Sequence, residues 1–270
     1  MSKKLLAGPY LLWMAGFIII PLALIVYYGV TDKSGAFTLA NIMSMATPEH
    51  RKALWLSLEL SFISTVICLI LAYPLAMILR NRGMGQGSFI VFIFILPMWM
   101  NFLLRTLAWQ TLLEKSGVIN GILTALHLPH QNLINTPSAI VLGMVYNFLP
   151  FMVLPIYNVL CKIEDNTINA ARDLGANFFQ TLIWIWLPLS VPGIISGITM
   201  VFVPALTTFV ISNLLGGSKI LLIGNVIEQE FTKSSNWNLG SGLSLVLMLF
   251  ILLSMALIAK YDKNGEGSAF

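Results

Sequence analysis

The 270-residue sequence is 57% hydrophobic and only 10% charged, whereas soluble domains average about 25% charged residues. Its net charge of +4 comes from scattered residues without basic clusters, which excludes nucleic acid as a partner. A membrane-spanning helix needs about 20 apolar residues, so six such helices with short loops would use most of the length. We therefore expect an all-α integral membrane protein with a single transmembrane domain over residues 1–270.

Long apolar runs recur along the chain, each bounded by polar or Gly- and Pro-containing segments. The first follows Lys3 and Lys4 and is too long for a signal peptide, so we expect it to be retained as a helix. The core of the domain is expected at about residues 53–259. The six predicted spanning helices are Leu5–Val30, Ala53–Leu79, Ser88–Leu113, Ser138–Cys161, Thr181–Ile211 and Ser241–Ala259.

The distribution of positive charge predicts the orientation in the membrane. A cytoplasmic N-terminus places eight Lys and Arg residues inside and six outside, and an excess of positive residues is typical of the cytoplasmic side. Arg51 and Lys52 are among those outside. With six spans, both termini are then cytoplasmic. Cys68 and Cys161 fall within and at the end of predicted spans, a placement that favours free thiols over a disulfide.

A polar segment, Lys162–Gln180, joins the fourth and fifth predicted spans on the cytoplasmic side. Within it Ile168, Ala171 and Leu174 recur at three-residue spacing, which predicts the apolar face of a short helix. A helix of two turns is unstable alone in water. This face must therefore dock either on the protein's own loops or on a partner.

The residues that follow predict where this short helix ends and the next one begins. Gly175 supplies a stop, because a residue without Cβ readily adopts the backbone conformation that ends a helix. Asn177 and Gln180 have the spacing of a capping box, with Asn as the cap. The sequence thus predicts a short helix, a turn and a new helix that enters the membrane.

A motif runs through this segment with the spacing Asn-Ala-Ala, three residues, Gly, nine residues, then Ile-x-Leu-Pro. Its members are Asn169, Ala170, Ala171, Gly175, Ile185, Leu187 and Pro188. The pattern resembles the cytoplasmic signature Glu-Ala-Ala-x3-Gly-x9-Ile-x-Leu-Pro of ABC import permeases, with Asn169 where the family has Glu. The resemblance implies a type I ABC importer permease fold with a cytoplasmic coupling helix, which lies in a cleft of the ATPase subunit and carries its closure to the membrane helices.

Further segments are similar to spermidine/putrescine import permeases over nearly the whole chain. The resemblance implies ATP-driven import of polyamines by alternating access in the cytoplasmic membrane. Its implied partners are membrane lipid, a second similar permease, two ATPase subunits and an extracytoplasmic polyamine-binding protein. ATP would bind to the ATPase, and this chain would carry no cofactor. The similar segments are Pro97–Asn101 with Arg105, Thr136–Met152, Ala171–Ala176, Leu214–Gly217 and Leu222–Asn225.

Two charged residues fall within predicted spans at similar depth. Glu59 is about 9 Å below the outer end of the second helix, and Arg105 is about 12 Å below the outer end of the third, at about 1.5 Å per residue. Polyamines are polycations, so a carboxylate is a suitable contact along their path. Glu59 therefore either contributes to a substrate path or pairs with Arg105 or backbone groups to lower the cost of burial.

Three more residues are candidates for the substrate path. Trp99 and Asn101 follow Pro97, which can free backbone carbonyls toward a cavity, and an aromatic ring with an amide suits an ammonium ligand. Tyr146 precedes two prolines of the fourth span. The alternative for both aromatic residues is ordinary helix packing.

The outer segment Ser212–Gly240 is long for a loop between spans. It is a candidate for docking the binding protein or for a gate, and the alternative is a solvated loop with its own packing. The resemblance places an acidic residue where Asn213 stands, which makes Asn213 a further candidate for the substrate path.

Several functions are excluded or left open by what the sequence lacks. No Gly-x4-Gly-Lys-Ser/Thr loop occurs, so we expect a separate subunit to hydrolyse ATP and this chain not to be an enzyme. His50, His127 and His130 lack Cys, Asp or Glu at ligand spacing, so no metal site is expected.

Three other classes of protein compete with the ATP-driven polyamine permease. A secondary transporter would need more helices or an internal repeat, and a membrane enzyme would need a catalytic constellation. The same permease architecture importing another small solute stays open, because a fold does not determine the substrate.

Overall fold

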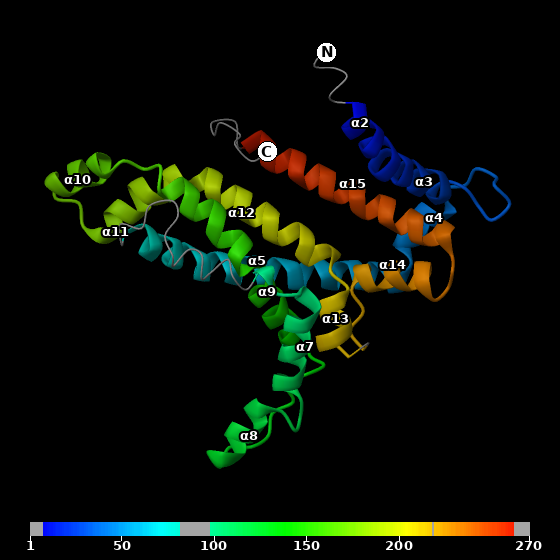
Figure 1. The fold of residues 1–270 in the computed structure, drawn as a ribbon, viewed down its shortest axis with the longest axis horizontal. Coiled ribbons are helices and arrows are strands. Elements are labelled where there is room, and N and C mark those ends of the chain that lie inside the picture. Colours follow the sequence, from blue (N-terminus) through cyan, green and yellow to red (C-terminus); the bar gives the residue numbers. More distant parts are fainter. Residues whose placement is uncertain (1–7, 82–97, 218, 262–270) are drawn as a thin grey trace. The chain divides into compact units, whose positions relative to one another are not determined.

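The computed structural model describes residues 8–81, 98–217 and 219–261, which form helices joined by turns. No β-strand occurs among these residues, and an isolated bridge joins Thr31 to Phe37. Figure 1 shows the helices in chain order. Five stretches in this part of the chain are long and apolar enough to cross a membrane, namely Gly8–Gly29, Pro48–Asn81, Pro137–Leu160, Phe178–Thr207 and Trp237–Ala256.

These five stretches confirm five of the six predicted spans, with ends that differ by a few residues. The remaining predicted span, Ser88–Leu113, lies partly outside the described residues. Its described part, residues 98–113, includes helix α7, Phe102–Leu113.

The chain divides into two compact units. One comprises the chain up to Trp55 together with Ile223–Ser254, and the other is built on Leu56–Leu222.

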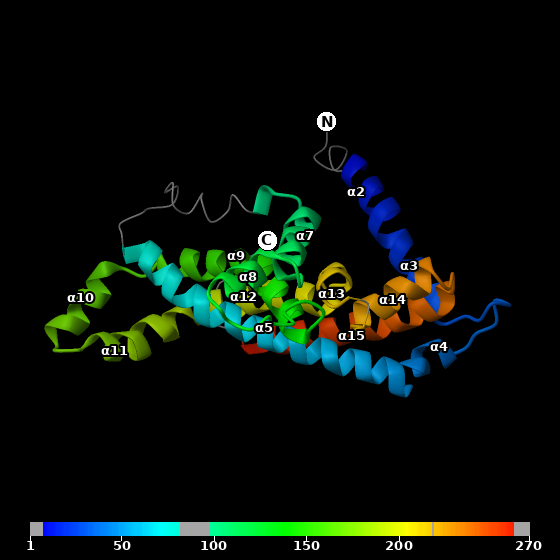
Figure 2. The same ribbon diagram turned by 90° about the horizontal axis from the view of Figure 1, so that it is seen from below.

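The larger unit is organised around three long helices. They are α5 (Pro48–Asn81, from Leu56 onward), α9 (Pro137–Leu160) and α12 (Leu187–Thr207). In both views these helices lie side by side (Figures 1 and 2). Tyr73 of α5 and Ser190 of α12 form a hydrogen bond of 3.0 Å. The buried core between the helices is apolar, with Met152, Ile156 and Val201 almost fully buried.

Small residues allow α9 and α12 to approach closely. A Cβ added at Gly193 of α12 would lie 2.9 Å from the carbonyl oxygen of Pro155 and 3.0 Å from Cβ of Val159. One added at Gly197 would lie 3.2 Å from the carbonyl oxygen of Met152. Small residues at helix contacts are typical of membrane bundles, where van der Waals packing drives association.

Shorter helices complete the larger unit. They are α8 (Val118–Ala125), α10 (Asp165–Asp173), α11 (Phe178–Thr181), a π-helix η3 (Leu182–Trp186) and α13 (Val210–Leu215). Figure 1 shows α10 and α11 at the far end of α12 from α13. Leu215 and Ile211 of α13 pack on Gly143 of α9.

The smaller unit contains the first and last spans. Its elements are α2 (Gly8–Met14), η1 (Ala15–Ile19), α3 (Ile20–Gly29), α4 (Ala40–Met43), η2 (Ser44–Ala46), α14 (Ile223–Thr232) and, as far as Ser254, α15 (Trp237–Tyr261). Asn238 Nδ2 donates to the carbonyl oxygens of Thr31 and Tyr28 at 2.7 and 3.2 Å. These bonds hold the start of α15 to the end of α3.

The segment Ser212–Gly240 contains more regular structure than a loop. It includes the end of α13, all of α14 and the start of α15. Ser212 Oγ donates to the carbonyl oxygen of Ile220 at 2.8 Å, and Ile223, Gly224 and Asn225 at the start of α14 are buried. The described part of this segment is therefore largely helical and not a loop, whereas its buried residues agree with the expectation that it has packing of its own.

Candidate coupling site and transport path

The predicted short helix is α10. Asp165 in its first turn and Arg172 in its last complement the helix dipole. Gly175 then has φ +85°. Its N–H donates to the carbonyl oxygen of Arg172 at 2.8 Å, and the N–H of Ala176 donates to that of Ala171 at 3.0 Å. This pair of bonds is a Schellman motif, which confirms the predicted stop.

The next helix begins at the predicted cap. Asn177 Oδ1 accepts from the N–H of Gln180, and Gln180 Oε1 accepts from the N–H of Asn177, both at 2.9 Å. The capping box is thus complete and opens α11. The π-helix η3 follows directly, and its first carbonyl, that of Leu182, accepts from the N–H of Leu187. Through η3 the chain enters α12 without an intervening loop.

The apolar residues of α10 do not form one buried face. Ile168 is 3% exposed, Ala171 is half-buried and Leu174 is 91% exposed. An α-helix turns about 100° per residue, so a residue six positions on lies about 120° round the helix from Ile168. The three-residue spacing therefore does not bring Leu174 to the buried side. Leu174 instead stands exposed, as do Phe178 and Phe179 after the turn.

The motif residues occupy two places along this segment. Asn169 and Ala170 lie exposed on α10, and the carbonyl oxygen of Ala170 accepts from the N–H of Leu174 at 3.1 Å. At the other end, Ile185 is half-buried in η3, whereas Leu187 and Pro188 are exposed in the first turn of α12. Proline is well suited to a first turn, where its missing N–H has no partner to lose.

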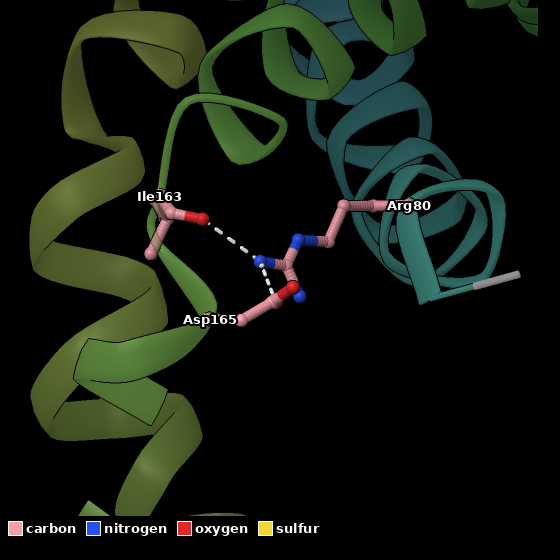
Figure 3. A network of polar contacts seen from close by, with 3 residues as sticks. All are labelled: Arg80, Ile163 and Asp165. Carbon is pink, nitrogen blue, oxygen red and sulfur yellow. Dashed lines mark hydrogen bonds and ion pairs between the residues drawn. The ribbon is translucent and has the colours of Figure 1, made fainter. Parts of the chain in front are cut away.

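Arg80, in the last turn of α5, makes three contacts, two with the segment Lys162–Gln180 and one with η3. Its Nη2 donates to the carbonyl oxygen of Ile163 at 2.8 Å and to Oδ1 of Asp165 at 2.7 Å (Figure 3). Its guanidinium carbon lies 4.6 Å from the ring centroid of Trp186. From the sequence, Arg80 is only one of the positive residues expected on the cytoplasmic side, and no local sequence pattern predicts these contacts.

The two charges of the predicted spans are not paired with each other. Glu59 is exposed on α5, whereas Arg105 of α7 is only 7% exposed. The ion pair found among the described residues is that of Arg80 with Asp165. Nε and Nη1 of Arg105 are buried without a hydrogen-bond partner in this part of the chain. A mutual ion pair therefore does not account for Glu59.

The remaining path candidates have different surroundings. Trp99 is 76% exposed. Asn101 is the N-cap of α7, and its Oδ1 accepts from the N–H groups of Leu103 and Leu104 at 2.9 and 3.3 Å. Tyr146 on α9 packs edge-to-face on Trp109, with ring centroids 5.4 Å apart.

Asn213, the last path candidate, is half-buried on α13. The helix that carries Tyr146 runs unbroken through Pro150 and Pro155, so no break in the helix opens beside that ring.

Comparison with known proteins identifies the family. The sequence pattern of binding-protein-dependent transport system inner membrane components matches residues 62–263. The chain belongs to this family. The match begins within α5 and includes the segment Lys162–Gln180 and the motif that ends at Pro188.

Curated relatives resemble the permease over nearly its full length. It is 35% identical over 260 residues to the spermidine/putrescine transport system permease protein PotB of Haemophilus influenzae, covering 93% of this chain and 90% of the relative. It is 36% identical over 251 residues to PotB of Escherichia coli, covering 90% and 91% of the two chains.

A solved structure confirms the fold. The permease matches a chain of a bacterial alginate ABC transporter, solved in complex with an alginate pentasaccharide-bound periplasmic protein, with a TM-score of 0.81. The identity is 16%, and the match covers 96% of this chain and 93% of the other. The protein is therefore an all-α, multi-pass membrane permease with the type I ABC importer fold, as the signature predicts.

Proposed function

We propose that this permease imports polyamines of the spermidine/putrescine class into the cytoplasm, driven by ATP hydrolysis on a separate ATPase subunit. A single observation supports polyamines as the cargo: relatives at 35–36% identity, matched over at least 90% of both chains, are named spermidine/putrescine transport permeases. The same architecture importing another small solute is the rival, because related folds carry different cargo.

The exposure of Glu59 supports a cationic cargo. A carboxylate on the surface of a membrane-spanning helix is costly against lipid, so such residues face a water-filled cavity or a partner subunit. Glu59 has this exposed position on α5. We assign Glu59 to the wall of the path, with Trp99, Asn101, Tyr146 and Asn213 as further contacts. An exposed indole such as that of Trp99 offers an ammonium group a cation–π contact.

The form of the α10 region supports coupling to the ATPase. Asn169 and Ala170 present small, uncharged side chains at the surface of α10, which suits a helix that lies in a groove. Beside them Leu174, Phe178 and Phe179 are exposed apolar side chains, which are better covered by another protein than by water. Because Asn169 has no charge, we infer that apolar packing, and not an ion pair at this position, holds the ATPase here.

The complete transporter in this proposal contains this chain, a second similar permease, two ATPase subunits and an extracytoplasmic polyamine-binding protein. ATP binding closes the ATPase dimer, α10 moves with it, and the bundle changes from inward-facing to outward-facing. This chain supplies no cofactor, and both its termini are cytoplasmic. Cysteine-accessibility labelling from each side of the membrane tests the orientation.

Reconstitution tests the cargo directly. The permease, purified with its co-expressed partner subunits and placed in proteoliposomes, should hydrolyse ATP faster when spermidine-loaded binding protein is added, and should accumulate spermidine. Stimulation by a different solute, with none by spermidine or putrescine, would overturn the cargo and keep the architecture.

A matched pair of variants on α5 tests the path. Glu59→Gln should lower the rate of spermidine uptake, since it removes the carboxylate from the spanning part of the helix. Glu49→Gln makes the same change in the exposed first turn of α5, outside the apolar stretch, and should transport as wild type. Unchanged uptake kinetics for Glu59→Gln would remove Glu59 from the path.

A further inference from the structure

Three helical elements of the larger unit meet at the guanidinium of Arg80. The side chain leaves the last turn of α5 and donates from Nη2 to the Ile163 carbonyl oxygen, just before α10, and to Asp165 within it (Figure 3). Its flat face lies over Trp186 of η3, the element that leads into α12. A planar guanidinium can donate from its edge while its face stacks on an aromatic ring.

The three contacts of Arg80 differ in strength. The Arg80 side chain is 13% exposed, whereas that of Asp165 is 80% exposed, and an ion pair with one partner in water contributes little. Ile163 and Trp186 are both buried. A charge-assisted hydrogen bond to a sheltered carbonyl and a sheltered cation–π contact are the stronger pair. The Ile163 carbonyl and the Trp186 ring therefore carry most of the connection.

Without these contacts α10 has little to hold it. It has nine residues, Ile168 is its buried residue, and turns flank it on both sides. A helix of this length has no stability of its own in water. A force on α10 would then bend the turns before it moved the spanning helices.

We infer that Arg80 is a positioning residue for the coupling helix, which fixes the start of α10 to the end of α5 and to the base of α12. Through this connection a displacement of α10 reaches two spanning helices together. The inference rests on the proposed function, in which α10 is the element that the ATPase moves.

A graded set of variants separates the contacts. Arg80→Ala removes all three and should lower the spermidine transported per ATP hydrolysed by roughly tenfold or more, the order expected for a lost charge-assisted hydrogen bond. Arg80→Lys keeps a hydrogen-bond donor but loses the planar face, so its ratio of spermidine transported to ATP hydrolysed should lie between those of Arg80→Ala and wild type. Asp165→Asn should lower it less than about fivefold, because that carboxylate is exposed. Arg51→Ala, in the exposed first turn of the same helix, is the control.

The experiment uses the assembled transporter in lipid nanodiscs and proteoliposomes. Hydrogen exchange of the α10 amides is measured together with the ratio of spermidine uptake to ATP hydrolysis. We expect Arg80→Ala to assemble with its partners, to exchange the α10 amides about tenfold faster, the same order as the loss of coupling, and to hydrolyse ATP with little transport. Arg51→Ala should match wild type in both measurements.

Two results would overturn the inference. One is an unchanged rate of α10 exchange in Arg80→Ala. The other is less assembled transporter with an unchanged ratio, which would show a purely structural role. A wild-type transporter that does not couple spermidine uptake to ATP hydrolysis would overturn the proposed function instead, and the exchange rate would still decide whether Arg80 holds α10.

Discussion

Replacing Gly175 by alanine should uncouple transport from ATP hydrolysis without unfolding the permease. Gly175 has φ +85°, a backbone conformation that residues with a Cβ disfavour. An added Cβ would have no heavy atom within 4 Å, so the cost comes from the backbone alone. That cost is about 1–2 kcal/mol, which shifts the equilibrium away from the intact turn by roughly 5- to 30-fold.

Two matched variants isolate this cause. Asparagine adopts the left-handed conformation more readily than alanine, so Gly175→Asn should keep most of the coupled uptake. Gly35, in the turn after α3, has φ +84° with its nearest neighbour, the Tyr27 hydroxyl, 4.0 Å from an added Cβ. Gly35→Ala thus imposes the same strain away from the coupling segment and should leave coupling unchanged.

The assay is spermidine uptake per ATP hydrolysed in proteoliposomes, with the thermal unfolding midpoint of the purified transporter as a check on folding. We expect Gly175→Ala to lower the ratio and leave the midpoint close to that of wild type. Wild-type coupling in Gly175→Ala, or an equal loss in Gly35→Ala, would refute the reasoning, because the effect would then not depend on the turn after α10.

Two further predictions concern packing and capping. Gly193→Ala should lower the unfolding midpoint by overpacking α9 against α12, at a cost of about 1–3 kcal/mol. Gly121→Ala in α8, where an added Cβ meets nothing within 4 Å, should be neutral or stabilise by up to about 1 kcal/mol. The same unfolding midpoint for Gly193→Ala and Gly121→Ala would contradict this. Asn101→Ala should cost about 1 kcal/mol through the lost cap of α7, whereas Asn101→Ser should keep stability. Low spermidine uptake by a stable serine variant would place the amide in the path.

Features that depend on residues close together in the sequence could be predicted. Gly175 ends α10 because a residue without Cβ adopts that φ most readily. Asn177 and Gln180 open α11 because their side chains reach backbone groups three residues away. The apolar runs likewise predict the spans, because the bilayer sets their length.

Features that depend on distant parts of the chain could not be predicted in this way. Arg80 lies 83 residues from Ile163 and 85 from Asp165, and no sequence pattern links them. The burial of Asn225 at the start of α14 likewise depends on tertiary packing. The exposure of Leu174 is different, because the pitch of an α-helix alone separates it from Ile168 by about 120°.

The π-helix η3 has a consequence for how the segment turns. The bond from the Leu187 N–H to the Leu182 carbonyl spans five residues, where an α-helix would span four. The π-helix between α11 and α12 thus contains one more residue than an α-helical turn would. Since each residue of an α-helix accounts for about 100° of rotation, a change of η3 to α-helical bonding would rotate the preceding segment about the helix axis. Such a change in bonding would turn the junction while keeping α11 and α12 joined by a continuous hydrogen-bonded helix.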